Sequence, residues 1–194
     1  MKIKNHLPLF LFLVLLAAVA LLSLLPAAAA ETDNPLVTSC GCNAYVVEAD
    51  AKGLGVRSGP GEDYPVTTTL DRRAPVYITG SVGEWMRIST SRRDEKSGRW
   101  VPGDPIGWAG GRFLAVKTYY PDFCNINGSY CYDPSRRVFV FSRPINGSTI
   151  ITMIPEDTEV TIAGCWLGWI KVRYKGLEGW LIQYCLEPYG SCWW

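Results

Sequence analysis

Short apolar runs alternate with turn-forming residues along most of the chain after residue 43. Runs such as Tyr45-Val46-Val47, Val76-Tyr77-Ile78 and Val138-Phe139-Val140-Phe141 are rich in β-branched and aromatic residues, and glycine, proline or aspartate bounds them. This pattern predicts short β-strands. No long stripe of apolar residues at the helical period follows residue 30. Short strands separated by many turns predict an all-β fold, either a small barrel or a sandwich.

The longest apolar run lies at the N-terminus and has the pattern of an export signal. Lys2 and Lys4 precede a nearly wholly apolar stretch from Leu7 to Leu25, and four alanines, Ala27 to Ala30, follow. This order predicts a signal peptide over residues 1–30, cleaved after the last alanine, and therefore a secreted or extracytoplasmic protein of the cell envelope. An uncleaved membrane anchor is the alternative, because the run nearly reaches the roughly 20 residues that span a bilayer.

The chain repeats its own pattern at a spacing of 84 residues. A shift by that number places apolar residues on apolar residues, glycine on glycine and tryptophan on tryptophan. The aligned pairs are Val56/Val140, Ser58/Ser142, Pro60/Pro144, Leu70/Ile154, Val76/Val160, Ile78/Ile162, Gly80/Gly164, Trp85/Trp169 and Ile88/Val172. Such self-similarity indicates two copies of one fold.

Further along, the spacing falls to 72 residues, which aligns Gly107-Trp108 with Gly179-Trp180 and Leu114 with Leu186. The first copy therefore contains a 12-residue insertion, roughly within Ser89 to Ile106, whose mixed charges predict a solvated hairpin tip. The predicted organisation is a signal peptide (1–30), an N-terminal segment (31–43), a first domain (44–116), an ordered linker (117–135), a second domain (136–187) and an aromatic tail (188–194).

Composition and charge argue against several classes of function. The chain has 19 Lys and Arg against 18 Asp and Glu, a balance that gives no electrostatic reason to expect nucleic acid as a partner. The single histidine, His6, lies in the predicted signal peptide, so a serine or cysteine triad would lack its base. The acids Glu62-Asp63 and Glu156-Asp157 lie in predicted turns, and no phosphate-binding loop is recognisable. We expect neither catalysis nor a cofactor.

Seven cysteines follow the predicted signal peptide, and in an exported chain cysteines favour disulfides. Two of them flank a turn-rich segment in the linker and form the best local pair, and three crowd the C-terminal third, where we expect another pair. These candidates are Cys124 and Cys131 in the linker, and Cys165, Cys185 and Cys192 in the C-terminal third.

Cys40 and Cys42 are too close in the sequence to pair easily, so we expect them to reach elsewhere. Two alternatives concern this region. Val37-Thr38-Ser39-Cys40 superficially resembles a lipobox, although Glu31, Asp33 and Pro35 separate it from the apolar run. A zinc site would need a different spacing than Cys-Gly-Cys and lacks a histidine, so we expect no metal.

Residues 54–65, LGVRSGPGEDYP, form the most specific motif of the chain. Their glycines and prolines predict a loop with one defined path. The motif resembles the opening of a bacterial SH3-like domain, and the later segments 66–70, 75–80, 83–88 and 107–114 resemble the rest of that family's outline. The resemblance implies two tandem SH3-like barrels, of which the second departs from the signature at Phe141-Ser142-Arg143-Pro144.

The resemblance also implies a ligand groove beside the first loop and, as ligand, the peptide or glycan of the cell wall. The ligand residues that it nominates are Arg57, Glu62, Asp63, Tyr64 and Trp85 in the first copy, and Arg143 and Trp169 in the second copy. Trp100, in the insertion, is a further candidate, because an indole on an exposed loop is a common contact residue. Aromatic faces with a polar handle, together with arginine, suit such ligands. The alternatives are that Arg57 braces the loop and that the repeated tryptophans, including Trp108 and Trp180, pack in the cores.

Two functions remain open at this point. One is a non-catalytic secreted protein that binds cell-wall peptide or glycan. The other is an envelope structural or protein-protein interaction module with no wall ligand, for which the aromatic tail, Trp193-Trp194, is a candidate contact.

Overall fold

A computed structural model gives the structure of the chain and describes residues 37–48, 52–119, 125–126, 129–130, 132–133, 135–183 and 186. The predicted signal peptide, the aromatic tail and the cysteines at 124, 131, 185 and 192 lie outside these residues. Strands dominate the described part, which confirms the all-β prediction. No helix within it is long and apolar enough to cross a membrane.

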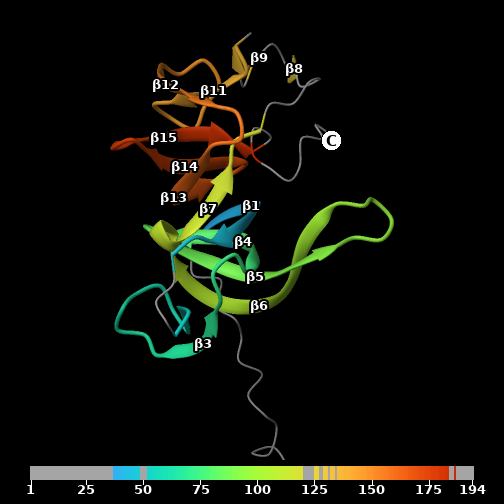
Figure 1. The fold of residues 1–194 in the computed structure, drawn as a ribbon, viewed down its shortest axis with the longest axis vertical. Helices are drawn as coiled ribbons and strands as arrows, with labels where there is room; N and C mark the ends of the chain where they lie inside the picture. The colour runs from blue at the N-terminus through green and yellow to red at the C-terminus, as the bar shows by residue number, and fades with distance from the viewer. Residues whose placement is uncertain are drawn as a thin grey trace, which may run out of the picture. The chain divides into compact units, whose positions relative to one another are not determined.

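Strands follow one another along the whole described chain (Figure 1). The first group is β1 (Thr38–Val46), β2 (Leu54–Arg57), β3 (Val66–Leu70), β4 (Pro75–Val82), β5 (Trp85–Arg93), β6 (Trp100–Gly110), the 3-10 helix η1 (Gly111–Phe113) and β7 (Leu114–Lys117). The second group is β11 (Arg137–Phe141), β12 (Ile150–Pro155), β13 (Glu159–Trp166), β14 (Trp169–Tyr174) and β15 (Leu177–Ile182). Three short strands lie between them: β8 (Asn125–Ile126), β9 (Ser129–Tyr130) and β10 (Tyr132–Asp133).

The first barrel has the neighbour order β7-β1-β4-β5-β6-β2-β3. Side chains alternate between its two faces, as a pleated strand requires. Val76 and Ile78 of β4, and Met86 and Ile88 of β5, are fully buried and form its core together with Leu114. The apolar positions of the sequence repeat are therefore the core positions of the barrel.

The second barrel has the order β7-β13-β14-β15-β11-β12, which repeats β1-β4-β5-β6-β2-β3 of the first with β7 in the place of β1. Its irregularities also repeat. The register shifts between Ile78 and Gly80 on β4 and again between Ile162 and Gly164 on β13. These shared β-bulges confirm that the 84-residue repeat is a repeat of structure.

β7 belongs to both barrels. In the first barrel it pairs with β1, opposing Val46 to Leu114, and in the second it pairs with β13 while Thr118 bridges Leu186. The backbone N–H of Val46 donates to Ala74 O (3.1 Å), and that of Thr118 donates to Thr158 O (2.9 Å). β7 thus does for the second barrel what β1 does for the first, and one continuous sheet runs through both.

The insertion in the first copy lengthens β5 and β6 into a hairpin that projects from the barrel (Figure 1). Its last paired residues are Arg93 and Trp100. Asp94 closes the turn, because its carboxylate accepts hydrogen bonds from the backbone N–H (2.7 Å) and the hydroxyl (2.7 Å) of Ser97. These bonds lower the pKa of Asp94.

A disulfide joins Cys40 of β1 to Cys165 of β13, across 125 positions of the sequence. The pair expected in the C-terminal third therefore does not include Cys165, and the other two cysteines of that region, Cys185 and Cys192, lie outside the described residues. Cys40 does reach a distant partner, as expected. Distance along the sequence does not decide this pairing, because the shared sheet brings β1 beside β13, where Leu167 N donates to Ser39 O (3.1 Å). The lipidation alternative for Cys40 is also wrong, since its sulfur is bonded. Cys42 is a buried free thiol, and burial raises its pKa to about 12.

Candidate ligand-binding groove

The loop after β2 has a fixed path that Arg57 braces. Ser58 N donates to Pro65 O (3.1 Å), which closes the base of the loop. The Nη1 atom of Arg57 donates to the carbonyl oxygens of Glu62 (2.8 Å) and Tyr64 (2.6 Å). Charged donors make strong hydrogen bonds, so this side chain holds the two halves of the loop together.

Tyr64 completes the same loop by packing over Gly59. A Cβ atom at Gly59 would lie 2.3 Å from the Tyr64 ring, a distance that no side chain tolerates. Tyr64 remains 46% exposed, but neither it nor the exposed Asp63 lines the groove described next. The structure therefore places these two predicted ligand residues beside the groove.

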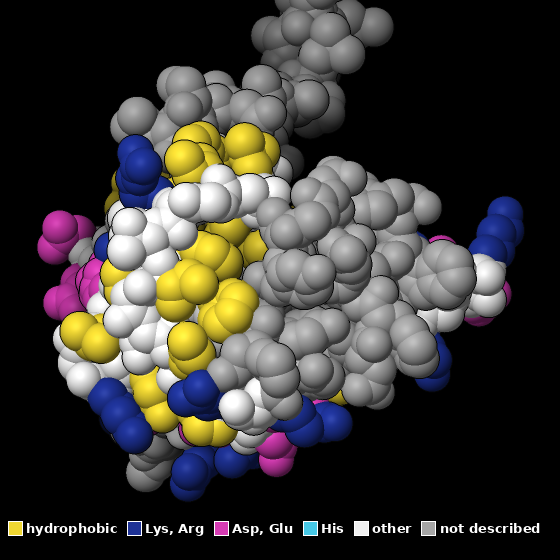
Figure 2. Space-filling model, turned by 90° about the horizontal axis from the view of Figure 1, so that it is seen from above, with side chains coloured by type: hydrophobic (Ala, Val, Ile, Leu, Met, Phe, Trp, Pro, Cys, Tyr) yellow, Lys and Arg dark blue, Asp and Glu magenta, His cyan; other side chains and the backbone are white. Residues whose placement is uncertain are grey.

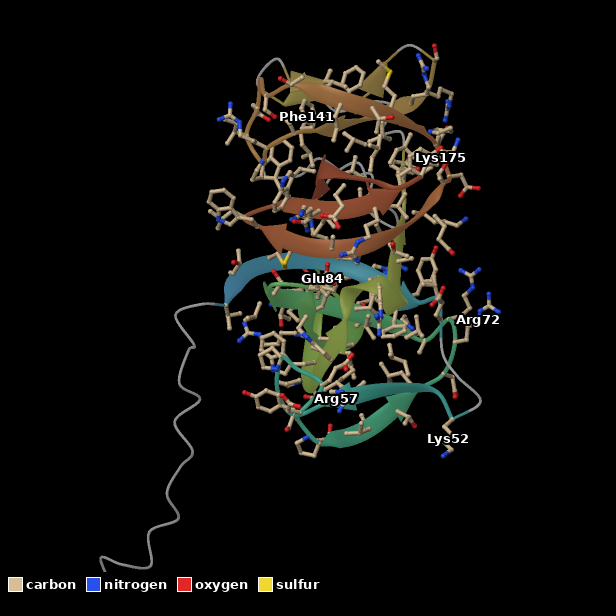
Figure 3. All side chains as sticks on the ribbon, turned by 90° about the vertical axis from the view of Figure 1, so that its left-hand side faces the viewer. Lys52, Arg57, Arg72, Glu84, Phe141 and Lys175 are labelled. Carbon is tan, nitrogen blue, oxygen red and sulfur yellow. A yellow bond between two sulfur atoms is a disulfide. The ribbon has the colours of Figure 1, made fainter. Side chains whose placement is uncertain are left out.

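An open groove of about 630 Å³ lies along the first barrel next to this loop. Three predicted ligand residues, Arg57, Glu62 and Trp85, come together there from β2, the loop and β5. Figure 3 shows Arg57 and Arg72 on this barrel. The lining residues are Val47, Glu48, Gly53, Leu54, Gly55, Arg57, Glu62, Arg72, Trp85, Gly110, Arg112 and Phe113.

Charge in the groove is mixed, with three arginines and two glutamates among the lining residues. Arg112 lies 3.9 Å from a Glu62 oxygen, and both side chains are mostly exposed, so this pair is weak and can exchange partners. Arg112 also lies over the Phe113 ring, 4.6 Å from its centroid. The groove thus offers aromatic faces beside guanidinium groups, a combination that suits carboxylate-bearing peptides.

Sequence reasoning missed Arg72, Arg112 and Phe113. The family signature draws attention to the first loop, whereas these residues come from the β3–β4 turn and from η1. Arg112-Phe113 directly precedes the aligned Leu114 of the closing segment, so the closing segment was the signal that pointed to them.

The second copy keeps the loop backbone and changes its side chains. Ser142 N donates to Thr149 O (2.8 Å), as in the first loop. Phe141 stands where the first copy has Arg57, and its ring meets that of Trp169 edge-on, with centroids 5.5 Å apart. Arg143 is exposed, and its carbonyl accepts a hydrogen bond from the Ser148 hydroxyl (2.9 Å). Trp169 is therefore engaged in packing, in line with the alternative for the repeated tryptophans.

Trp100 does not lie in this groove. It lines a separate, smaller groove between the inserted hairpin and β1. Trp108 and Trp180, the other repeated tryptophans, are partly buried and oppose Arg57 and Phe141 across the sheet. Within the described ranges, no three His, Cys, Asp or Glu side chains are grouped so as to hold a metal ion.

Comparison with protein families agrees with this architecture. The sequence profile described as bacterial SH3 domain matches residues 52–115 and 136–187, which together make up more than half of the chain. The search of curated proteins found no match. Two solved structures from Trichomonas vaginalis show a distant likeness, each with a TM-score of 0.28: NlpC2 (16% identity) and NlpC1 (14% identity).

These two alignments cover 77% and 79% of this chain, which in turn spans 48% and 49% of theirs, or about half the length of each. The profile match is the informative one, because its two regions coincide with the two repeats and leave out β1, the strand that precedes the first. The chain belongs to the bacterial SH3 domain family.

Proposed function

We propose that the protein is a non-catalytic, exported binding protein that recognises cell-wall material through the groove of its first barrel. The observation that carries this proposal is the convergence of Arg57, Glu62 and Trp85 on one open groove of about 630 Å³. Ligand sites of this size typically combine apolar walls with a few placed polar groups. Membership of the bacterial SH3 domain family supports an extracellular wall ligand.

The charges of the groove favour the peptide part of the wall over its glycan part. Arg72 and Arg112 are exposed and lie at a groove that also holds Trp85. Arginine pairs with carboxylates through two parallel hydrogen bonds, and free carboxylates are abundant on short peptides. The two glutamates at the groove add sites for an ammonium group, so a peptide carrying both charges fits it best.

The test is retention on purified insoluble peptidoglycan of the protein as processed by an exporting host. The variant Arg72→Glu/Arg112→Glu reverses two groove charges without touching the loop brace, and Arg99→Glu, on the exposed hairpin, is its matched control. We expect wild type and control to be retained and the double variant to lose at least about tenfold in bound fraction. Failure of wild type to bind, or equal retention of all three, would overturn the proposal.

One observation favours the second candidate, a protein-protein interaction module. Apolar side chains of the second barrel are exposed on β12 and the loop before it, including Ile145 (46%), Ile150 (41%) and Met153 (36%). Figure 2 views the molecule from this end and shows hydrophobic side chains gathered there. Exposed apolar patches of this kind often mark contacts with other proteins. Absence of wall retention would favour this candidate.

A further inference from the structure

We propose that the first barrel carries a second ligand site, for a neutral saccharide, in the groove between the inserted hairpin and strands β1 and β7. This groove has a volume of about 350 Å³, which falls within the roughly 300–1,000 Å³ of small-molecule sites. Its lining residues are Asn43, Ala44, Tyr45, Arg73, Pro75, Ser91, Trp100 and Lys117. None of them lines the peptide groove proposed above.

The groove depends on the insertion. Trp100 is the first residue of β6 and pairs with Arg93 near the end of the hairpin, in the part of the chain for which the second copy has no counterpart. Ser91 comes from the lengthened end of β5. The site is therefore a feature of this chain's first copy and not of the repeated scaffold.

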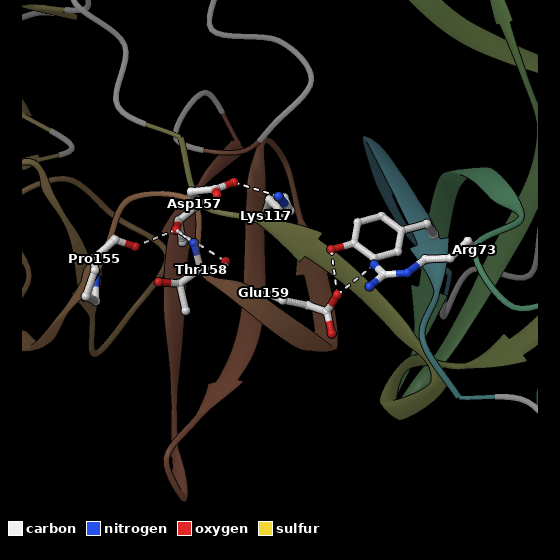
Figure 4. Close-up of polar contacts among 8 residues, drawn as sticks. Arg73, Lys117, Pro155, Asp157, Thr158 and Glu159 are labelled. Carbon is white, nitrogen blue, oxygen red and sulfur yellow. Dashed lines mark hydrogen bonds and ion pairs between the residues drawn. The ribbon is translucent and has the colours of Figure 1, made fainter.

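The cations at the groove are already neutralised. Figure 4 shows Arg73 with Glu159, and Lys117 with Asp157, at distances of 2.9 Å and 2.6 Å. Both acids come from the second barrel. The Arg73–Glu159 pair therefore joins the barrels along one wall of the groove, and the Lys117–Asp157 pair connects the shared strand β7 to the second barrel. An anion at this place would have to displace a carboxylate, and the charge balance therefore favours a neutral ligand.

Tyr45 adds a phenol that stays uncharged. Its hydroxyl donates to Glu159 Oε2 (2.9 Å), and Arg73 lies over its ring at 5.0 Å from the centroid. Burial, followed by the hydrogen bond to Glu159, raises the pKa of Tyr45 to about 12. The Tyr45 phenol therefore adds no charge to the groove at physiological pH.

The remaining groups match the two sides of a sugar ring. Trp100, Ala44 and Pro75 offer apolar surface, on which the C–H face of a sugar can lie. The Oδ1 atom of Asn43 accepts a hydrogen bond from the Ser91 hydroxyl, which fixes the amide. Its N–H donors have no acceptor among the described residues and suit hydroxyl or acyl oxygens. A wholly apolar ligand would leave these donors unsatisfied, at a cost in binding.

The probe is triacetylchitotriose, a neutral oligosaccharide, titrated calorimetrically into the complete exported protein. We expect saturable binding that Trp100→Ala weakens at least about tenfold. Trp166→Ala is the matched control, because it removes an exposed indole (44%) that lies on β13 of the second barrel. Trp166→Ala and Arg72→Glu/Arg112→Glu should bind like wild type.

Asn43→Ala is a second test variant, in case Trp100→Ala does not fold. Thermal unfolding midpoints show whether each of the two variants is folded. The inference is overturned if wild type does not bind the trisaccharide, or if both variants fold and bind like wild type. It is also overturned if the arginine reversal, and not Trp100→Ala, abolishes binding. The two proposals can fail separately. If wild type binds the trisaccharide but is not retained on peptidoglycan, the saccharide groove stands and the peptide groove fails.

Discussion

The two barrels differ where a ligand would be bound and agree almost everywhere else. The two barrels share their strand order and both pairs of bulges. The backbone hydrogen bonds of their loops also correspond: Gly61 N donates to Gly59 O (3.0 Å), and Ile145 N donates to Arg143 O (2.8 Å). The side chains on these similarly bonded loops differ. The Arg57 guanidinium group holds the first loop. In the second copy Phe141, at the position of Arg57, packs against Trp169 instead, and the Ser148 hydroxyl donates within the loop to Arg143 O.

This difference teaches that backbone and core specify the barrel, while a few loop side chains specify its chemistry. The exchanges are also coupled. In the first copy the Tyr64 ring lies over Gly59 and leaves no room for a side chain there. The second copy has Ser148 at the position of Tyr64, and the smaller residue leaves room for Arg143 at the position of Gly59. The shared strand β7 then makes the two barrels one folding unit, which the following predictions test.

The largest expected effect comes from the disulfide between the barrels. Cys40→Ala/Cys165→Ala should lower the free energy of unfolding by about 4–5 kcal/mol, because the bond closes a loop of 125 positions and restricts the unfolded chain. Urea denaturation measures the change. A single transition should remain, because β7 still joins the two sheets.

Each single cysteine variant is the control for this experiment. Cys40→Ala and Cys165→Ala remove the same bond, so each should cost nearly as much as the double variant, and their effects should not add. Additive effects would show that the two cysteines do not act through one bond. Two separate unfolding transitions would show that the barrels unfold independently.

The barrels themselves were accessible from the sequence, and the physical reason is repetition. A core position such as Ile78 is apolar in both copies because each barrel buries it completely. Gly107 recurs as Gly179 because a Cβ atom at Gly107 would lie 2.5 Å from Arg57 O and one at Gly179 would lie 2.4 Å from a Val140 methyl. Steric demands of this kind select the same residue type in each copy, so the sequence shows them as a repeat.

The connection between the barrels has no repeated sequence pattern of this kind. Lys117 and Thr118 fall in the predicted linker, yet they continue the sheet into the second barrel. Pairing between β1, β7 and β13 connects residues far apart in the sequence, and a local pattern carries no information about it. The same holds for the groove: its loop residues were recognisable, whereas Arg72 and Arg112 reach it only through the fold.

A second prediction concerns Thr118, which stands where the first barrel has Val46. Its hydroxyl donates to Pro155 O (2.7 Å) and accepts from Thr158 N (2.9 Å), and the residue is fully buried. Thr118→Val keeps the shape but removes both bonds, so the free energy of unfolding should fall by about 1–3 kcal/mol. Urea denaturation again provides the measurement.

Val46→Thr is the reciprocal variant at the equivalent, fully buried position of the first barrel. A hydroxyl placed there by the substitution meets an environment that evolved around a methyl group, so this change should also destabilise the protein. A neutral effect of Thr118→Val would mean that its hydroxyl contributes nothing to the joint between the barrels.

The third prediction tests the coupled exchange in the loops. Gly59→Ala forces the Tyr64 ring out of its place and should cost about 1–3 kcal/mol, through crowding rather than through the backbone. Tyr64→Ser, which copies the second loop, should restore most of that loss in the double variant. A double-mutant cycle measures the coupling, and additive effects of the two changes would contradict the proposed contact.

The smallest effect should come from acid. Glu178 accepts hydrogen bonds from Lys171 Nζ (2.6 Å) and Arg173 Nε (2.8 Å), and these partners, Lys171 first, lower its pKa. A lowered pKa in the folded state contributes stability above the unfolded value of about 4.3, and this contribution is lost as the pH falls through the folded value. Glu178→Gln should therefore be less stable by up to about 1 kcal/mol at pH 7 and match wild type in strong acid.

This measurement distinguishes the two barrels, because the charge cluster exists in only one of them. The first copy has Ile106 at the position of Glu178 and Ser89 at the position of Arg173. The acid-dependent stability that Glu178 contributes therefore has no counterpart at the aligned position of the first barrel, whose own carboxylate with a lowered pKa, Asp94, lies in the inserted hairpin. Glu95→Gln, on the exposed hairpin tip of the first barrel, is the control and should leave the dependence of stability on pH unchanged. Added salt should shrink the Glu178 effect, since the pair is partly exposed. An unchanged acid slope in Glu178→Gln would show that this charge cluster contributes nothing measurable to the second barrel.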